Sequence, residues 1–253
     1  MLTMATIPIF NLSRYDLLLV LVVSLQATVV AYLHRPFWKG VVYILPLPFT
    51  FAALALGQPV DATNVVGLLL GFQYIHGVRW LYADRGVPIV AAIAASALTY
   101  ALLGWGLAAV VPATSMTFGV AVVAAFGTSV VAMKLQPHRT EPGHQTTLPV
   151  WQKLPIIAAV ILLLVISKHE LRGFMTMFPM VGLVAAYEAR HSLWTMSRKI
   201  AVQGLATGAL MIVCRLTQSR YGLSAGLALG WVAYLAMMIP LLRAMWRGQN
   251  EEG

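Results

Sequence analysis

Two pairs of cations, each followed by an apolar stretch that contains proline, are the residues best suited to chemistry in this chain. Arg35 and Lys39 precede one such stretch, and Lys168 and Arg172 precede the other. The free N–H groups and the dipole of a helix N-terminus attract anions, and a neighbouring cation adds to that attraction. The arrangement suits a carboxylate or a phosphate. The alternative is that these cations anchor two membrane helices to lipid headgroups.

A proline interrupts each of these two apolar stretches. Pro46 lies in the first and Pro179 in the second. Proline removes a backbone donor and frees a carbonyl one turn earlier, which in lipid needs a partner from protein, water or ligand. Short, proline-broken segments at matching places in two halves are the best sequence indication of a transporter's binding site. We therefore predict that Pro46 and Pro179 belong to one ligand-binding site.

A polar stripe crosses an otherwise apolar segment in the first half of the chain. Gln73 and His76 are spaced to lie on one face of a helix. Polar side chains in a membrane helix face the bundle interior or a cavity. One interpretation is that His76 bonds to a neighbouring helix. The other is that it senses protons or contacts a substrate, because imidazole has an ordinary pKa of about 6.5.

Glu188 and His191 form an E-x-x-H pair at the end of the second proline-broken stretch. Such a pair can serve a di-metal carboxylate site, but the further Glu and His ligands are missing at membrane depth, so we predict no metal and no cofactor. Glu188 can instead form a cytoplasmic ion pair or gate with Arg190 or Arg198. It can equally be a proton-coupling carboxylate.

The composition requires a lipid environment for these residues. The 253 residues are 60% apolar and only 10% charged, whereas soluble domains average roughly 45–50% and about 25%. This excludes a soluble enzyme, a secreted domain and a disordered protein. The net charge of +9 comes from cations between apolar runs, which favours membrane loops over nucleic-acid binding. The single cysteine, Cys214, excludes an intramolecular disulfide.

A membrane-spanning helix needs about 20 apolar residues, and nine runs come near that length. We therefore predict an all-α, polytopic transmembrane helix bundle of about nine helices. The runs are Tyr15–Leu33, Gly40–Leu56, Asn64–Tyr82, Val87–Val111, Ser115–Met133, Leu154–Ser167, Gly173–Tyr187, Ile200–Leu216 and Leu223–Leu242.

Nine spans would place twelve of the seventeen Lys and Arg residues on one side of the membrane and five on the other. Loops rich in Lys and Arg stay in the cytoplasm. We therefore predict a protein integral to the bacterial inner membrane, with the N-terminus outside and the C-terminus in the cytoplasm.

An internal repeat relates the two halves. Placing Arg35 on Lys168 aligns Arg35–Gly40 with Lys168–Gly173 and, without a gap, Pro46 with Pro179. Five spans separate the two repeat starts, so the second repeat would be inverted, as in many secondary transporters. We predict a four-helix repeat over 1–112, a linking helix and cytoplasmic linker over 113–153, and an inverted repeat over 154–253. A duplicated scaffold without transport is the alternative.

The second half also resembles the GlpM-like family of small membrane proteins. The resemblance rests on Ser167-Lys168, Gly173, Phe178-Pro179 and Ala186-Tyr187, and it covers about the last hundred residues with a weaker echo in the first half. It implies a compact multi-helix inner-membrane protein with a link to exopolysaccharide production. It supplies no catalytic residues.

The function predicted from these features is that of a secondary transporter or channel-like protein for a small solute, with an anion as one candidate. The alternative is a membrane-embedded enzyme or assembly factor acting on a lipid-linked or exopolysaccharide intermediate. The expected partners are membrane lipids, a small-molecule or ionic substrate and a second copy of the chain, with no nucleic acid. The predicted ligand-binding residues are Arg35, Lys39, Pro46, Gln73, His76, Lys168, Arg172, Pro179 and Glu188.

Overall fold

The computed structural model describes residues 13–166 and 173–251, and the regular elements in these ranges are all helices. Five stretches of these residues are long and apolar enough to cross a membrane. The elements are α1 (Arg14–Tyr32), α2 (Pro36–Tyr43), α3 (Leu47–Leu56), α4 (Ala62–Arg79), the π-helical turn η2 (Trp80–Asp84), α5 (Ile89–Val110), α6 (Ser115–Leu135), α7 (Val150–Ile166), α8 (Gly173–Thr176), α9 (Met180–Glu188) and α10 (Leu193–Glu251).

Local sequence explains several of these boundaries. Ser13 caps α1, and its side chain and that of Asp16 accept each other's backbone N–H. Asp61 and Asn64 form the same reciprocal box at the start of α4. Gly222 interrupts α10 with a φ of 82° and a ψ of 165°, a backbone conformation that glycine adopts most readily. The element α10 is therefore two helices, over residues 193–221 and 223–251.

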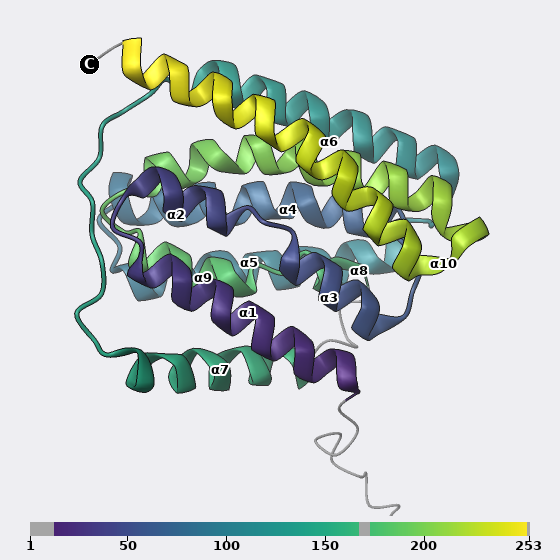
Figure 1. The fold of residues 1–253 in the computed structure, drawn as a ribbon, viewed down its shortest axis with the longest axis horizontal. Coiled ribbons are helices and arrows are strands. Elements are labelled where there is room, and N and C mark those ends of the chain that lie inside the picture. The colour runs from purple at the N-terminus through teal and green to yellow at the C-terminus, as the bar shows by residue number, and fades with distance from the viewer. Residues whose placement is uncertain (1–12, 167–172, 252–253) are drawn as a thin grey trace, which may run out of the picture.

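The helices lie side by side along the long axis of the molecule, and the chain reverses direction between most of them, whereas α3 continues the direction of α2 beyond the proline break (Figure 1). The central helix is α4, which packs against α5, α6, α8 and α10. Its residues Tyr74, Ile75 and Val78 are fully buried. On another side of the bundle, α1 packs against α3, α7 and α9. The core therefore lies around α4, between the two halves of the chain.

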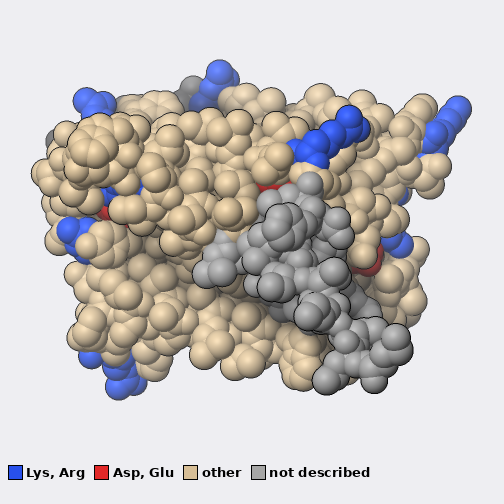
Figure 2. Space-filling view, turned by 90° about the horizontal axis from the view of Figure 1, so that it is seen from below, with Lys and Arg blue, Asp and Glu red and all other residues tan. Residues whose placement is uncertain are grey.

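The outside of the bundle is apolar. On α6, Met116 and Val123 are 82% and 73% exposed, and Trp105 on α5 is also exposed. On the face in Figure 2, most of the surface is free of charged residues, and Lys and Arg lie mainly toward the ends of the long axis. Large apolar surfaces of this kind favour contact with lipid over water. The fold is that of a helical membrane protein.

The predicted runs fall on helices, but three helices begin four or more residues earlier than the sequence indicates. The second predicted run begins at Gly40, whereas α2 begins at Pro36. The sixth predicted run begins at Leu154, whereas α7 begins at Val150; the eighth begins at Ile200, whereas α10 begins at Leu193. The cations that mark these predicted ends are buried in the protein. Lys153 pairs with a carboxylate, and the Nζ of Lys199 lies 3.6 Å from the centroid of the Phe37 ring.

Candidate functional site

Both proline breaks line one cavity in the middle of the bundle. Pro46 separates α2 from α3, and Pro179 separates α8 from α9. The cavity has a volume of about 40 Å³, which leaves room for roughly two or three water molecules. Its lining residues are Tyr43, Leu45, Pro46, Pro48, Phe49, Leu68, Gly71, Thr176, Met177, Phe178, Pro179, Met180, Val181, Gly182, Ile200 and Gln203. The two prolines predicted to share a site therefore lie together.

The first break exposes backbone carbonyls, and side chains from other helices bond to them. The prolines at 46 and 48 cannot donate to the carbonyls of Val42 and Ile44, four residues earlier. Gln26 of α1 donates through Nε2 to Val42 O at 2.7 Å and to Leu45 O at 3.1 Å. Tyr234 of α10 donates its hydroxyl to Ile44 O at 2.9 Å. The break is stabilised by α1 on one side and α10 on the other.

The second break is held by a different set of bonds. Tyr100 of α5 donates its hydroxyl to Phe174 O at 2.9 Å, and the N–H of Met177 donates to the same oxygen at 3.2 Å. The side-chain amide of Asn64 donates to the hydroxyl of Thr176 at 2.8 Å. These contacts attach α8 to α4 and α5, which belong to the first half of the chain.

Tyr100 and Tyr234 make reciprocal contacts between the two halves. Tyr100 belongs to the first half and bonds to the break in the second; Tyr234 belongs to the second half and bonds to the break in the first. Their separation along the chain is only one residue longer than that of Pro46 and Pro179, which the predicted repeat aligns. Each tyrosine therefore bonds to the other half's proline break.

Buried polar atoms without a partner lie at and beside the cavity. Gln203 lines it, and its Oε1 has no hydrogen-bond partner among the described residues. The hydroxyl of Tyr74 is also buried without one. A Cβ at Gly182 would lie 2.9 Å from the Tyr74 ring and 3.2 Å from the Tyr43 hydroxyl, so glycine is what lets α9 pack closely here. Buried polar groups of this kind are normally satisfied by water or a ligand.

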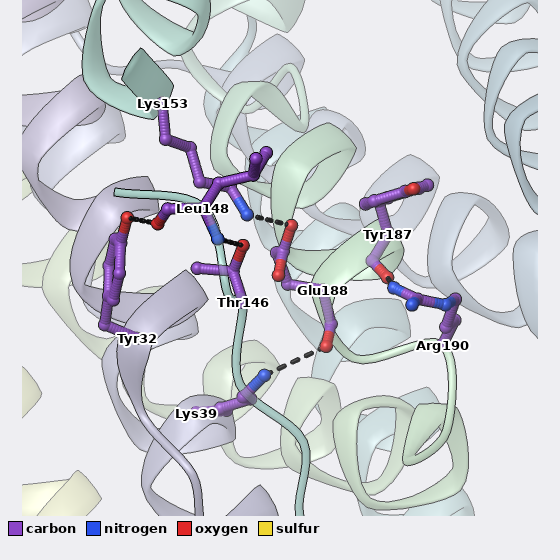
Figure 3. Close-up of polar contacts among 8 residues, drawn as sticks. All are labelled: Tyr32, Lys39, Thr146, Leu148, Lys153, Tyr187, Glu188 and Arg190. Carbon is purple, nitrogen blue, oxygen red and sulfur yellow. Dashed lines mark hydrogen bonds and ion pairs between the residues drawn. The ribbon is translucent and has the colours of Figure 1, made fainter. Parts of the chain in front are cut away.

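A buried ion pair lies at one end of the bundle, which we call the basic end. The Nζ of Lys153 on α7 is 2.5 Å from Oε1 of Glu188, the last residue of α9 (Figure 3). Lys39 of α2 donates to the backbone carbonyl of Glu188 at 2.9 Å. All three residues are buried, with Lys39 only 1% exposed. Three elements meet at Glu188.

The partner of Glu188 differs from the two that the sequence suggests. The sequence predicts an ion pair with Arg190 or Arg198, but the carboxylate pairs with Lys153. Arg190 donates instead to the carbonyl of Tyr187 at 3.0 Å (Figure 3). The reason is that α9 ends against the first turn of α7, so the lysine there is nearer than the arginines that follow in the chain.

The linker over residues 136–149 crosses the basic end (Figure 1). Glu141 accepts bonds from the backbone N–H groups of Trp194 and Thr195, at 3.1 and 2.6 Å, and so caps the start of α10. The N–H of Thr146 donates to the carbonyl of Ala31 at 3.2 Å, and Tyr32 donates to that of Leu148. The linker is therefore bound along this end.

The four predicted cations do not all lie where an anion site would need them. Arg35 is exposed just before α2. Lys39 is buried and contacts the Glu188 carbonyl. Lys168 and Arg172 lie outside the described residues. Neither Arg35 nor Lys39 lines the cavity, and anion binding by these cations stays a prediction.

The polar stripe on α4 lies beside the cavity and not in its lining. Oε1 of Gln73 is buried without a partner among the described residues. The ring nitrogens of His76 lie 3.4 Å from Nε2 of Gln136, just after α6. This contact favours the interpretation that His76 bonds to a neighbouring element.

Sequence reasoning missed Gln26, Lys153, Tyr100 and Tyr234. One signal was available for the tyrosines, since their separation nearly matches that of the two aligned prolines. Gln26 is an isolated amide in an apolar helix, which by itself indicates a polar contact without naming the partner.

No family model matches the chain, and no curated protein or solved structure is similar to it at a significant level. The resemblance to GlpM-like proteins therefore stays a prediction, and the functional argument rests on the geometry of this molecule.

Proposed function

We propose that this chain is a secondary transporter or channel-like protein of the bacterial inner membrane, for a small solute with an anion among the candidates. The observation that carries the proposal is that Pro46 and Pro179 line the same cavity. Broken helices that meet inside a bundle are the usual construction of a transporter's binding site. Unpaired polar atoms at Gln203 and Tyr74 add groups that a solute can satisfy.

The proposal includes nine membrane crossings arranged as two inverted repeats. The first repeat comprises α1 to α5, the second comprises α7 to α10, and α6 links them. The reciprocal bonds of Tyr100 and Tyr234 support this assignment. So does the packing, since α8 packs on α4 while α2 packs on α10. Two related halves around a central site provide the symmetry needed for access to alternate between the two membrane faces.

In the proposed mechanism the structure corresponds to a closed state. The cavity holds only a few water molecules, and the pair of Lys153 with Glu188 closes the basic end, beneath the linker. Opening that end requires this pair to separate or α9 to move. Glu188 is then the gate residue, because its carboxylate must separate from Lys153 when this end opens.

Access to the cavity from the two membrane faces tests the proposal. Cys214, the single native cysteine, is replaced by alanine, and Gly71→Cys places one thiol in the cavity lining. A Cβ at Gly71 meets no atom within 4 Å, so the substitution fits. The matched control is Gly119→Cys, which is equally unhindered and lies on the exposed face of α6. A charged, membrane-impermeant thiol reagent is then applied from each side of sealed vesicles.

For a transporter, the reagent should modify Gly71→Cys from both sides, and Gly119→Cys should stay unmodified in lipid. Modification from neither side would overturn the transport proposal and leave a scaffold. Modification from one side only would mean a fixed vestibule and would also contradict it.

The predicted orientation has its own test. A reporter that is active only in the cytoplasm should give signal when fused after Gly253, and no signal when inserted between Val111 and Ser115. The reverse pattern would overturn the assignment of the basic end to the cytoplasm.

A further inference from the structure

A second, larger cavity lies at the end of the bundle opposite the basic end. It opens between the start of α6 and residues 212–219 of α10, and its volume is about 570 Å³. Cavities of roughly 300–1,000 Å³ are typical of ligand sites. Its polar lining residues are Ser115, Arg215, Gln218 and Ser219, and its apolar ones include Phe118 and Leu216.

Arg215 is fixed in the wall of this cavity. One terminal nitrogen donates to the carbonyl of Val60 at 3.1 Å, and the guanidinium lies 5.1 Å from the centroid of the Phe118 ring. Gln218 stabilises the same loop by accepting from Val60 N–H at 2.9 Å and donating to Val60 O at 3.0 Å. A guanidinium has five N–H donors, and the bond to Val60 uses one of them.

The charge of Arg215 is not balanced by an acidic residue in the cavity. None of the lining residues carries a carboxylate, and none of the ion pairs between described residues includes Arg215. Hydroxyl groups of Ser115 and Ser219 lie in the same lining and can donate hydrogen bonds. A positioned guanidinium with nearby hydroxyls is well suited to a phosphate.

The surroundings indicate what kind of molecule carries the phosphate. Leu216, in the cavity lining, is 74% exposed, and Met116 and Val120 continue an exposed apolar surface along α6. A ligand here meets a cation and hydroxyls at the end of the bundle, and an apolar surface along its side. That is the distribution of polarity in a phospholipid, with its phosphate at the membrane surface and its acyl chains in the core.

We propose that the cavity around Arg215 is a binding site for the phosphate group of an anionic phospholipid. The guanidinium and the two serine hydroxyls hold the phosphate, and the exposed face of α6 accommodates an acyl chain. This site is separate from the central cavity, and the proposal does not depend on transport.

Native mass spectrometry of the full chain in detergent tests the site, with phosphatidylglycerol as the probe. Arg215→Gln should weaken phosphatidylglycerol binding about tenfold, as expected for the loss of a charge-assisted contact. The matched control is Arg220→Gln, since Arg220 is exposed five residues further on and stacks on Tyr221 at 5.4 Å. This control should bind the lipid as the parent does. Equal loss in both variants, or in neither, would overturn the site.

Two further measurements test the site if Arg215→Gln does not fold, and distinguish a lipid phosphate from free phosphate. Should Arg215→Gln fail to fold, Ser219→Asp puts a negative charge at the exposed rim without touching Val60, and it should also weaken lipid binding. Inorganic phosphate at millimolar concentration should not displace phosphatidylglycerol. Displacement that is lost in the Arg215 variant would mean that the site takes free phosphate, which overturns the assignment to a lipid.

Discussion

The two proline breaks line the same cavity, yet they are stabilised differently. At the first break, Gln26 bonds to two carbonyls and Tyr234 to a third. At the second, the side-chain donor to a backbone carbonyl, among the described residues, is Tyr100. The predicted repeat aligns Gln26 with Ala159, whose side chain cannot donate. The tyrosine contact is common to both halves, whereas the glutamine contact belongs to the first alone.

Within the proposed transport cycle, this difference indicates which segment would move. The carbonyls at the first break are bonded to α1 and α10. Moving α2 and α3 would break these bonds, and each buried carbonyl left without a partner costs free energy. Among the described residues the second break has fewer such bonds, and its segment ends at Glu188, which pairs with Lys153 of α7. We infer that α2 and α3 form the fixed wall of the cavity, and that α8 and α9 form the wall that moves.

The largest expected effect on stability is at Glu188 of α9, whose backbone carbonyl also accepts a bond from Lys39 of α2. Glu188→Gln leaves the ammonium of Lys153 buried without its carboxylate. Losing one partner of a buried pair lowers the free energy of unfolding by about 3–5 kcal/mol. Thermal unfolding in detergent, followed by tryptophan fluorescence, measures the loss.

Two companion variants show whether the ion pair itself is responsible. Adding Lys153→Met to Glu188→Gln should recover most of the lost stability, because no buried charge then lacks a partner. Arg190→Gln, next to the pair but bonded to Tyr187 O, should stay close to the parent. A double variant as unstable as Glu188→Gln would mean that Lys153 is not the relevant partner.

The next largest loss of stability is expected at the first proline break, and it tests whether that break is more firmly held than the second. Gln26→Leu removes the side-chain donor to Val42 O and Leu45 O. Val42 O keeps its bond from the N–H of Leu45 at 3.3 Å, so we expect the change to cost about 2 kcal/mol of unfolding free energy, mainly at Leu45 O. Ser24→Ala is the matched control on the same helix, because the Ser24 hydroxyl is buried without a partner among the described residues. That change should be neutral or slightly stabilising. Equal losses in the two variants would remove the distinction between a fixed and a moving wall.

A smaller pair of effects compares the tyrosines. Tyr234→Phe removes the side-chain donor to Ile44 O and should cost about 1–2 kcal/mol. Tyr100→Phe should cost less, about 1 kcal/mol, because Phe174 O keeps its bond from the N–H of Met177. Unfolding of the two single variants and the double variant gives the order and the sum. The losses should add, since the two contacts share no residue; a reversed order would contradict the reciprocal assignment.

Much of the fold could be predicted from the sequence because lipid imposes simple rules on it. Apolar runs of sufficient length become helices, and prolines at 46 and 179 break two of them. The positions of Lys residues were a poor guide to where the helices begin. The sequence predicts that spans begin just after Lys153 and Lys199, but both lysines are buried inside helices. Each helix extends beyond its lysine because the buried cation has a partner in the protein, and the sequence does not reveal that partner.

The candidate site was predictable in position and not in contacts. The predicted repeat places Pro46 and Pro179 at matching positions, and matching positions in inverted halves meet near the axis between them. The donors at these breaks come from α1, α5 and α10. Which residue reaches a freed carbonyl depends on helix packing and rotation. An isolated glutamine such as Gln26 signals a polar contact without specifying it.

The smallest expected effect is a pH dependence of stability that arises in the linker over residues 136–149, which crosses the basic end. The rings of His144 and His191 lie 5.2 Å apart. Partial desolvation, and then the positive charges of Arg190 and Lys39, lower the pKa of His144 from its ordinary value of 6.5. The folded chain therefore binds this proton less readily than the unfolded chain. Stability from neutral His144 is present above pH 6.5 and is lost as the pH falls toward the lowered pKa.

The measurement compares the midpoint of thermal unfolding at about pH 7.5 and about pH 5.5 in the parent and in His144→Gln. The parent should lose more stability than the variant across this interval, because glutamine does not titrate. The midpoints at the higher pH should nearly coincide, since His144 is only partly buried. An identical acid-induced loss in both would show that His144 does not couple the linker to pH, and that the basic end is held by Lys153 and Glu188 without its help.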